Sequence, residues 1–308
     1  MKAKADWLNR IGTPETAVFP KTRELLKRYD FPEFEAELYL QANGTRKDGR
    51  ITYQKLLMAF PKNRQEKTPA VAVPFYYPEA TLGFDPETGA SLPRFADNPT
   101  LLDLVRRGYV AATAEAYYLT FVEGDRSWED FSRWQAAATE LLEENPNWTG
   151  IGKLIADTGL VIDALAEDPR VDAERIGIAG HSLGGKMAFY TGCLDDRVKA
   201  ILASDFGIGW DQTNWQDLWY WGKKVETLKN DGFCHSSLLN SVAPKPFCLL
   251  AGNYDNEESR RIVLEAEGYR EYPDRCLVIN HATGHRPPRY IAAAGYGFLD
   301  YWLKGEPK

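Results

Sequence analysis

The chain has 308 residues and a formal net charge of −7, from 37 basic and 44 acidic side chains. Hydrophobic residues make up 44% and charged residues 26%, a globular composition that excludes a disordered, collagen-like or disulfide-scaffold chain. A net negative charge does not indicate the basic surface that binds nucleic acid or an anionic membrane. We therefore expect no nucleic-acid partner and no membrane partner.

The first ten residues are mixed and polar and lack the pattern of a signal peptide. No apolar run approaches the roughly 20 residues that a membrane-spanning helix needs. These features predict a cytoplasmic protein. No metal and no cofactor are expected, because the histidines and acidic residues show no metal-binding spacing. The cysteines lack metal-binding spacing and are expected to be free thiols: Cys193, Cys234, Cys248 and Cys276.

The N-terminal 68 residues have a pattern of their own within a predicted single domain spanning residues 1–308. Residues 14–29 are expected to form a helix with Leu25 and Leu26 on its apolar side. Two strand-like runs follow, at 34–41 and 51–59, joined by a polar turn with two glycines. This is a hairpin signal, and we expect the hairpin to supply an antiparallel edge of the sheet.

From residue 69 onwards, short apolar runs alternate with longer helical stretches. This alternation predicts an α/β fold with a mostly parallel central sheet and helices on both faces. The expected strands are residues 70–74, 109–114, 175–179, 198–204, 246–251 and 276–280.

An aromatic-rich stretch at residues 206–240 interrupts this alternation after the expected strand at 198–204, which is the sixth when the two hairpin strands are counted. A single βα unit needs about 30 residues, so the longer interval there indicates an insertion. Its aromatic rings either stack on a sugar or an acyl group above the site or form a small core of the insertion. On the first interpretation, Trp210 and Trp215 bind the substrate.

The strongest chemical signal is Gly-His-Ser-Leu-Gly-Gly at residues 180–185, between an apolar strand and a helix. This strand–turn–helix context predicts a nucleophile elbow with Ser182 at its tip. Gly180 and Gly184 remove side chains that would collide where the strand and helix approach each other. The backbone N–H of Leu183, at the start of the helix, then faces a developing oxyanion.

A serine nucleophile needs a base, and the chain has four histidines. His181 adjoins the serine, and its side chain is expected to point away from it. His235 lies in the insertion, as a substrate contact or a surface residue. His281 and His285 both follow the last expected strand, and His285 is favoured because it lies further out in the loop.

The third member of the triad is left open between two aspartates. Asp255 follows the strand at 246–251, and Asp205 ends the strand at 198–204. Asp255 is favoured because 30 residues separate it from His285, room for one helix and one strand. A second oxyanion donor is expected from the backbone of Phe75 or Tyr76, unless these are simply packed aromatic rings.

Together these motifs resemble the α/β-hydrolase family of serine esterases over residues of about 69–305. Within that family, the chain is most similar to the acetyl-xylan-esterase-like and glucuronoyl-esterase-like branches. The motifs that carry this resemblance lie at residues 180–186, 194–197, 252–255 and 284–288. The resemblance implies Ser182 as nucleophile, His285 as base and Asp255 as acid, with Lys186 as the helix lysine that contacts substrate. This chain differs in having Leu183 where the glucuronoyl enzymes have an arginine.

The expected function is a cofactor-free serine esterase that cleaves a carbohydrate-type or small-molecule ester through an acyl-enzyme. A small serine peptidase of the prolyl-oligopeptidase type is the alternative, although 68 residues are too few for the propeller of those enzymes. A non-catalytic hydrolase-like binding protein is the third possibility. Such proteins usually lack a triad member, and this chain has a candidate for each.

Overall fold

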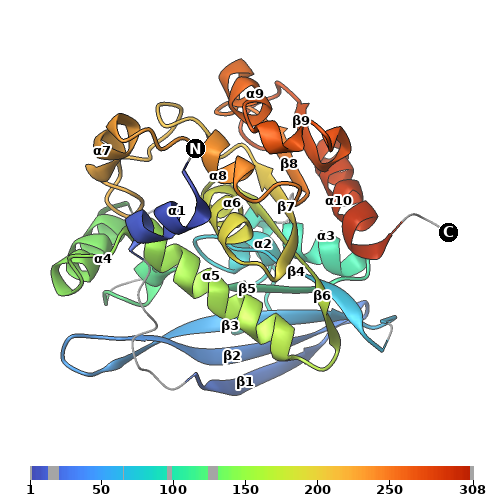
Figure 1. The fold of residues 1–308 in the computed structure, drawn as a ribbon. Helices are drawn as coiled ribbons and strands as arrows, with labels where there is room; N and C mark the ends of the chain where they lie inside the picture. The colour runs from blue at the N-terminus through green and yellow to red at the C-terminus, as the bar shows by residue number, and fades with distance from the viewer. Residues whose placement is uncertain (1, 13–20, 65, 96–98, 124–130, 306–308) are drawn as a thin grey trace.

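The computed structural model describes residues 2–12, 21–64, 66–95, 99–123 and 131–305. Within them, nine strands form one sheet in the order β1-β2-β3-β5-β4-β6-β7-β8-β9 (Figure 1). The first three strands and the β3–β5 pair are antiparallel, and the pairs from β5 through β4 to β9 are parallel. The strands are β1 (Arg23–Asp30), β2 (Phe34–Thr45), β3 (Ile51–Pro61), β4 (Thr68–Ala72), β5 (Val110–Ala114), β6 (Val171–His181), β7 (Val198–Ser204), β8 (Phe247–Ala251) and β9 (Cys276–Asn280).

Helices cover both faces of the sheet, because successive side chains of a strand point to opposite faces and both sets are apolar here. In β4, Ala70 and Ala72 face one core, and Val71 faces the other. One face carries α1 (Lys4–Ile11), α4 (Phe131–Glu144), α5 (Gly150–Glu167) and α6 (Leu183–Leu194) (Figure 1). The other carries α2 (Glu79–Leu82), α3 (Thr100–Arg106) and α10 (Arg289–Lys304). The predicted α/β class, with a mostly parallel sheet between helices, is confirmed.

The helix predicted over residues 14–29 is wrong where the structure describes it. Residues 23–30 form strand β1, and residues 14–20 lie outside the described residues. β1 is a largely exposed edge strand whose backbone pairs with β2. Charged side chains are typical of such edges, so the strand lacks the apolar alternation that would have revealed it. The predicted hairpin that follows is confirmed as β2 and β3.

The aromatic insertion lies between β7 and β8 and includes α7 (Lys224–Asn230) and α8 (His235–Asn240). Because β1 is a strand, the insertion follows the seventh strand and not the sixth. Its large rings are at most 9% exposed, and Trp7 of α1 packs among them: Trp210, Trp215, Trp219, Tyr220 and Trp221.

No helix among the described residues is both long enough and apolar enough to cross a membrane.

Candidate active site

The predicted elbow is present at the carboxyl end of β6. Ser182 follows the strand directly and precedes α6, and its backbone is left-handed, with φ of 57° and ψ of −118°. A non-glycine residue in this region costs about 1–3 kcal/mol, a strain that concentrates at functional sites. The Ser182 N–H donates to the carbonyl of Ser204 on β7 at 2.8 Å, which holds the turn against the sheet. The half-buried Ser182 hydroxyl has no hydrogen-bond partner among the described residues.

The glycines of the elbow are required by close backbone contacts. A Cβ on Gly180 would lie 2.0 Å from the carbonyl oxygen of Gly184, so the strand and helix could not approach as they do. A Cβ on Gly184 would lie 2.2 Å from the carbonyl oxygen of Pro74. The predicted collision between strand and helix is therefore confirmed for Gly180. Gly184 is also required by a close contact, but the obstacle is the loop after β4 and not the strand.

The histidine with an acidic partner at this sheet edge is His285, in the loop after β9. Its Nδ1 lies 2.7 Å from Oδ2 of Asp205, at the end of β7. Its ring centroid is 4.5 Å from that of His181, the residue before Ser182. Tyr254 packs edge-on against the same ring, with the centroids 4.8 Å apart. Asp205, His181 and Tyr254 thus surround the imidazole next to the elbow.

Asp205 is fully buried, yet it is built to remain ionised. Its two carboxylate oxygens accept backbone N–H groups from all four residues of the 252–255 turn, at 2.9–3.0 Å. Burial alone would raise the pKa of Asp205. The hydrogen bond from His285 and those from the turn outweigh burial and leave the pKa below its usual value. A charged carboxylate at Nδ1 orients the imidazole and stabilises its protonated form.

The predicted pairing of Asp255 with His285 is wrong. Asp255 is also fully buried, but its carboxylate accepts the N–H groups of Phe206, Gly207 and Ile208 at 2.8–3.1 Å, and the hydroxyl of Ser259 at 2.9 Å. These bonds turn Asp255 towards the start of the insertion. Its own N–H donates to Asp205, so it supports the carboxylate that reaches His285.

The other three histidines have structural partners. His181 hydrogen-bonds the hydroxyl of Ser204 at 3.1 Å, and burial, followed by the charge of His285, lowers its pKa to about 3. His235 is only 2% exposed and bonds the Tyr190 hydroxyl at 2.6 Å, so it is neither a surface residue nor open to substrate. His281 contacts Thr283 at 2.8 Å.

The loop after β4 lies against the first turn of α6, as an oxyanion hole requires. A Cβ at Gly184 would be 3.3 Å from the ring of Phe75. Within the described residues, no hydrogen bond uses the backbone N–H of Leu183, Phe75 or Tyr76, so the choice between Phe75 and Tyr76 as second donor stays a prediction. Tyr76 is packed inward: its ring stacks on Trp134 at 4.0 Å, and its hydroxyl lies 3.2 Å from that of Tyr220.

The tryptophans predicted to bind substrate are core residues. Trp215 is fully buried and donates its indole N–H to the Gly207 carbonyl at 2.7 Å. Trp210 donates to the carbonyl of Phe233 at 2.8 Å and stacks with Trp7. Trp210 packs against α1 and Trp215 against Tyr190 of α6, which corrects the substrate-binding interpretation in favour of a small aromatic core.

Lys186 is likewise enclosed, at 3% exposure, and does not reach an open surface. Its ammonium bonds the Thr213 hydroxyl at 3.0 Å and the Asn214 amide oxygen at 3.3 Å. It also lies 4.7 Å from the ring centroid of Trp215. Burial lowers the pKa of Lys186 to about 7. The lysine therefore ties α6 to the insertion, which corrects its prediction as a substrate contact.

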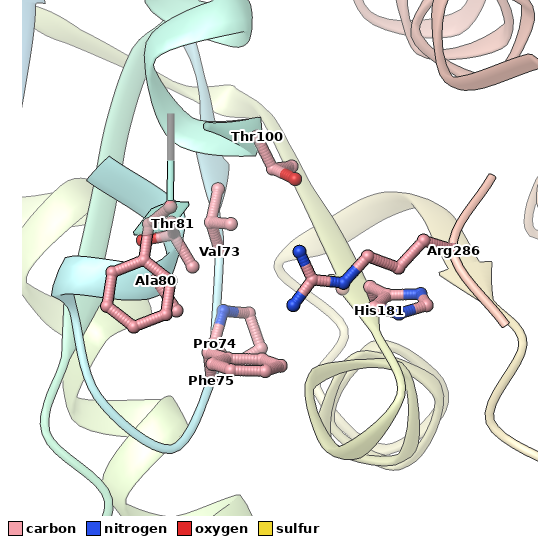
Figure 2. Close-up of a pocket in the computed structure, with 10 residues that line it drawn as sticks. Val73, Pro74, Phe75, Ala80, Thr81, Thr100, His181 and Arg286 are labelled. Carbon is pink, nitrogen blue, oxygen red and sulfur yellow. The ribbon is translucent and has the colours of Figure 1, made fainter. Parts of the chain in front are cut away.

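The open space at the elbow lies between the loop after β4 and the His285 loop (Figure 2). It is a pocket of about 40 Å³, and the Arg286 side chain extends into it (Figure 2). Arg286 was not singled out from the sequence, although it directly follows His285. Its position in that motif was the available signal. The remaining lining residues are Val73, Pro74, Phe75, Ala80, Thr81, Phe95, Thr100, Gly180 and His181.

No group of three or more histidine, cysteine, aspartate or glutamate side chains that could hold a metal ion occurs in the described parts of the chain.

Comparison with known proteins supports the predicted resemblance. A model of the family described as "Glucuronyl esterase, fungi" matches residues 150–231, which run from α5 through the elbow into the insertion. The Bacillus subtilis (strain 168) protein named "Putative hydrolase YtaP" is 28% identical over 168 residues, 49% of this chain and 54% of that protein. The alignment thus spans about half the length of that relative.

Solved structures match the chain over almost its whole length. A glucuronoyl esterase from Solibacter usitatus has a TM-score of 0.71 at 15% identity, covering 96% of this chain and 90% of that one. An acetyl xylan esterase from Paenibacillus sp. R4 has a TM-score of 0.59 at 15% identity, covering 92% and 88%. The chain has the α/β-hydrolase fold of these esterases, as predicted.

Proposed function

We propose that this protein is a serine carboxylesterase whose triad is Ser182, His285 and Asp205. One observation carries the proposal: the strained serine follows His181, whose ring lies 4.5 Å from that of His285, and a buried, ionised aspartate holds Nδ1 of His285. The three residues come from the ends of β6, β7 and β9, which meet at one edge of the parallel sheet. Ligands and catalytic groups gather at this edge in such folds.

In the proposed reaction, the Ser182 oxygen attacks the ester carbonyl while His285 Nε2 accepts the hydroxyl proton. This proton transfer requires the Ser182 hydroxyl and His285 Nε2 to come within hydrogen-bond distance when substrate binds. The N–H groups of Leu183 and Phe75 stabilise the oxyanion. The tetrahedral intermediate then expels the alcohol, which takes the proton from His285, and an acyl-enzyme remains. Water, deprotonated by the same histidine, attacks the acyl group and releases the acid and the serine.

The proposed substrate class is a carbohydrate-type or small-molecule ester. Support comes from the family model over residues 150–231 and from the names of the structural neighbours, which are glucuronoyl and acetyl xylan esterases. The test is a substrate panel: 4-nitrophenyl acetate and butyrate, acetylated xylo-oligosaccharides, a methyl glucuronate ester, and a dipeptide anilide for the peptidase alternative.

We expect ester turnover by the wild-type protein and a fall in kcat of about 10⁴–10⁶-fold in Ser182→Ala, with an unchanged melting temperature. The matched control is Ser91→Ala, at an exposed serine distant in sequence from the triad, which should retain wild-type rates. Full ester turnover by Ser182→Ala would overturn the proposal. Cleavage of the anilide alone would favour the peptidase.

A further inference from the structure

The pocket beside the elbow contains a charged group that the proposed triad does not use. Arg286 directly follows His285, and its guanidinium extends between Thr100 on one wall and Pro74 on the other (Figure 2). Phe75, whose N–H is a proposed oxyanion donor, and His181, which adjoins the nucleophile, also line this space. A group bound by Arg286 would therefore lie in a pocket that shares Phe75 and the elbow residues Gly180 and His181 with the proposed active site.

Nothing among the described lining residues neutralises this charge. The other side chains of the pocket are apolar or hydroxyl-bearing, apart from His181. That histidine is uncharged at neutral pH, because burial first, and the charges of His285 and Arg286 with it, lower its pKa to about 3. Among the described residues, the pocket thus presents one permanent positive charge, that of Arg286, beside mostly apolar walls.

Arg286 also differs from other arginines of this chain. Arg46 bonds Glu144, Arg170 bonds Glu37, and Arg197 bonds Asp163, each through its guanidinium. Arg286 makes no hydrogen bond or ion pair within the described residues. An arginine that is left unpaired at a pocket beside a nucleophile is available to a ligand.

We propose that Arg286 binds a carboxylate carried by the substrate and separate from the reacting carbonyl, which makes the enzyme selective for esters with an acidic substituent. This inference rests on the proposed esterase function and goes beyond it by naming the substrate's charge. A carboxylate matches the planar guanidinium in shape and accepts two parallel N–H groups from it. The pocket is large enough for such a compact group.

The first experiment compares pairs of esters that differ mainly in charge. Mono-4-nitrophenyl glutarate is paired with 4-nitrophenyl valerate to place the carboxylate on the acyl side. The pair 4-acetoxybenzoate and 4-acetoxybenzamide places it on the alcohol side. We expect the wild-type protein to prefer the acidic member of at least one pair in kcat/KM. This preference should fall by about 10–100-fold in Arg286→Gln, mainly through KM, and weaken in high salt.

The matched control is Arg289→Gln, three residues along the chain at the exposed start of α10, which should retain the wild-type preference. If Arg286 had only a structural role, Arg286→Gln would lower kcat/KM equally for the acidic and the neutral ester of a pair. An unchanged ratio of the two kcat/KM values would therefore overturn the inference. Turnover of neutral esters with no preference for the acidic ones also overturns it, while the proposed esterase function stands.

A second measurement does not depend on turnover. Isothermal titration of monoethyl glutarate into Ser182→Ala should show binding that weakens by about 10–100-fold in Ser182→Ala/Arg286→Gln. Equal affinity in the two proteins, or no binding to either, would overturn the inference. If no ester is cleaved but this difference in affinity is found, the esterase proposal fails and the carboxylate site remains.

Discussion

The two sides of Ser182 differ in what they offer a substrate. On the side of the insertion, Trp215 and Lys186 are enclosed, and both hydrogen-bond residues of the insertion. On the side of the loop after β4, Phe75 and Arg286 line an open pocket. Trp210 and Trp215, which the sequence suggested as substrate-binding residues, therefore stabilise the insertion. The charged side chain among the described lining residues of the open pocket is that of Arg286.

This difference shows how the site is supported. The insertion begins directly after Asp205, so its packing determines where that carboxylate lies. Asp255 holds the first residues of the insertion through three backbone N–H groups, and Lys186 holds residues 213 and 214. We infer that the closed side keeps the triad in place and that the open side selects the substrate. Substitutions on the closed side and in the triad test this division.

The largest effect is expected from Asp205→Asn, which should lower kcat for a neutral ester by about 10³–10⁴-fold. An amide cannot stabilise protonated His285 as a carboxylate does, and it favours the wrong tautomer of the ring. The measurement is kcat of the purified variant, with circular dichroism to confirm folding.

The companion variant, Asp255→Asn, separates the two aspartates. Its amide group would face backbone donors, at a cost of about 1–3 kcal/mol for each donor left without an acceptor. We expect a lower free energy of unfolding and a much smaller loss of kcat than in Asp205→Asn. A larger loss of kcat in Asp255→Asn would contradict the assignment of the acid.

The next effect concerns the closed side. Trp215→Ala should lower the free energy of unfolding by about 3–5 kcal/mol, because the ring is fully buried and its N–H bonds Gly207. KM for esters should stay close to that of the wild type under conditions where the variant is folded. Urea unfolding measures the free energy of unfolding, and steady-state kinetics measures KM. The control is Tyr290→Ala, which removes a ring that is 69% exposed. A raised KM without lost stability would mean that the insertion contacts substrate.

The smallest effect is a dependence of stability on pH. Burial is the main cause that lowers the pKa of His235 to about 3, from a usual value of 6.5. The unfolded chain therefore takes up a proton below pH 6.5 that the folded protein excludes, so stability is lost as the pH falls from 6.5 towards 3. Between pH 7.5 and pH 5 the loss from this residue is about 2 kcal/mol. Urea unfolding of His235→Gln should show a pH dependence weaker by that amount, and an unchanged dependence would contradict the burial of a neutral ring.

Much of the fold could be predicted because its signals are local. The strands from β4 to β9 are short apolar runs, and the elbow is a contiguous motif whose glycines are required by backbone contacts within a few ångströms. β1 was missed because it is a mostly exposed edge strand rich in charged residues. It is held by pairing with β2, which its own residues do not reveal.

The site was predictable only where neighbours in sequence determine it. Ser182 and His285 follow from their motifs. The choice between Asp205 and Asp255 depends on how the 252–255 turn folds over the end of β7, a contact across about 50 residues. The burial of Trp210 and Trp215 depends on the N-terminal helix, whose Trp7 completes their core. Composition alone cannot distinguish an aromatic core from an aromatic binding surface.

The most direct test of the central claim is the mass of the protein after reaction with a fluorophosphonate, followed by peptide mapping. The account predicts one adduct per chain, located on Ser182, with its formation slowed strongly in both His285→Ala and Asp205→Asn. No adduct, an adduct on another residue, or unchanged labelling of Ser182 in those two variants would contradict a nucleophile activated by His285 and Asp205.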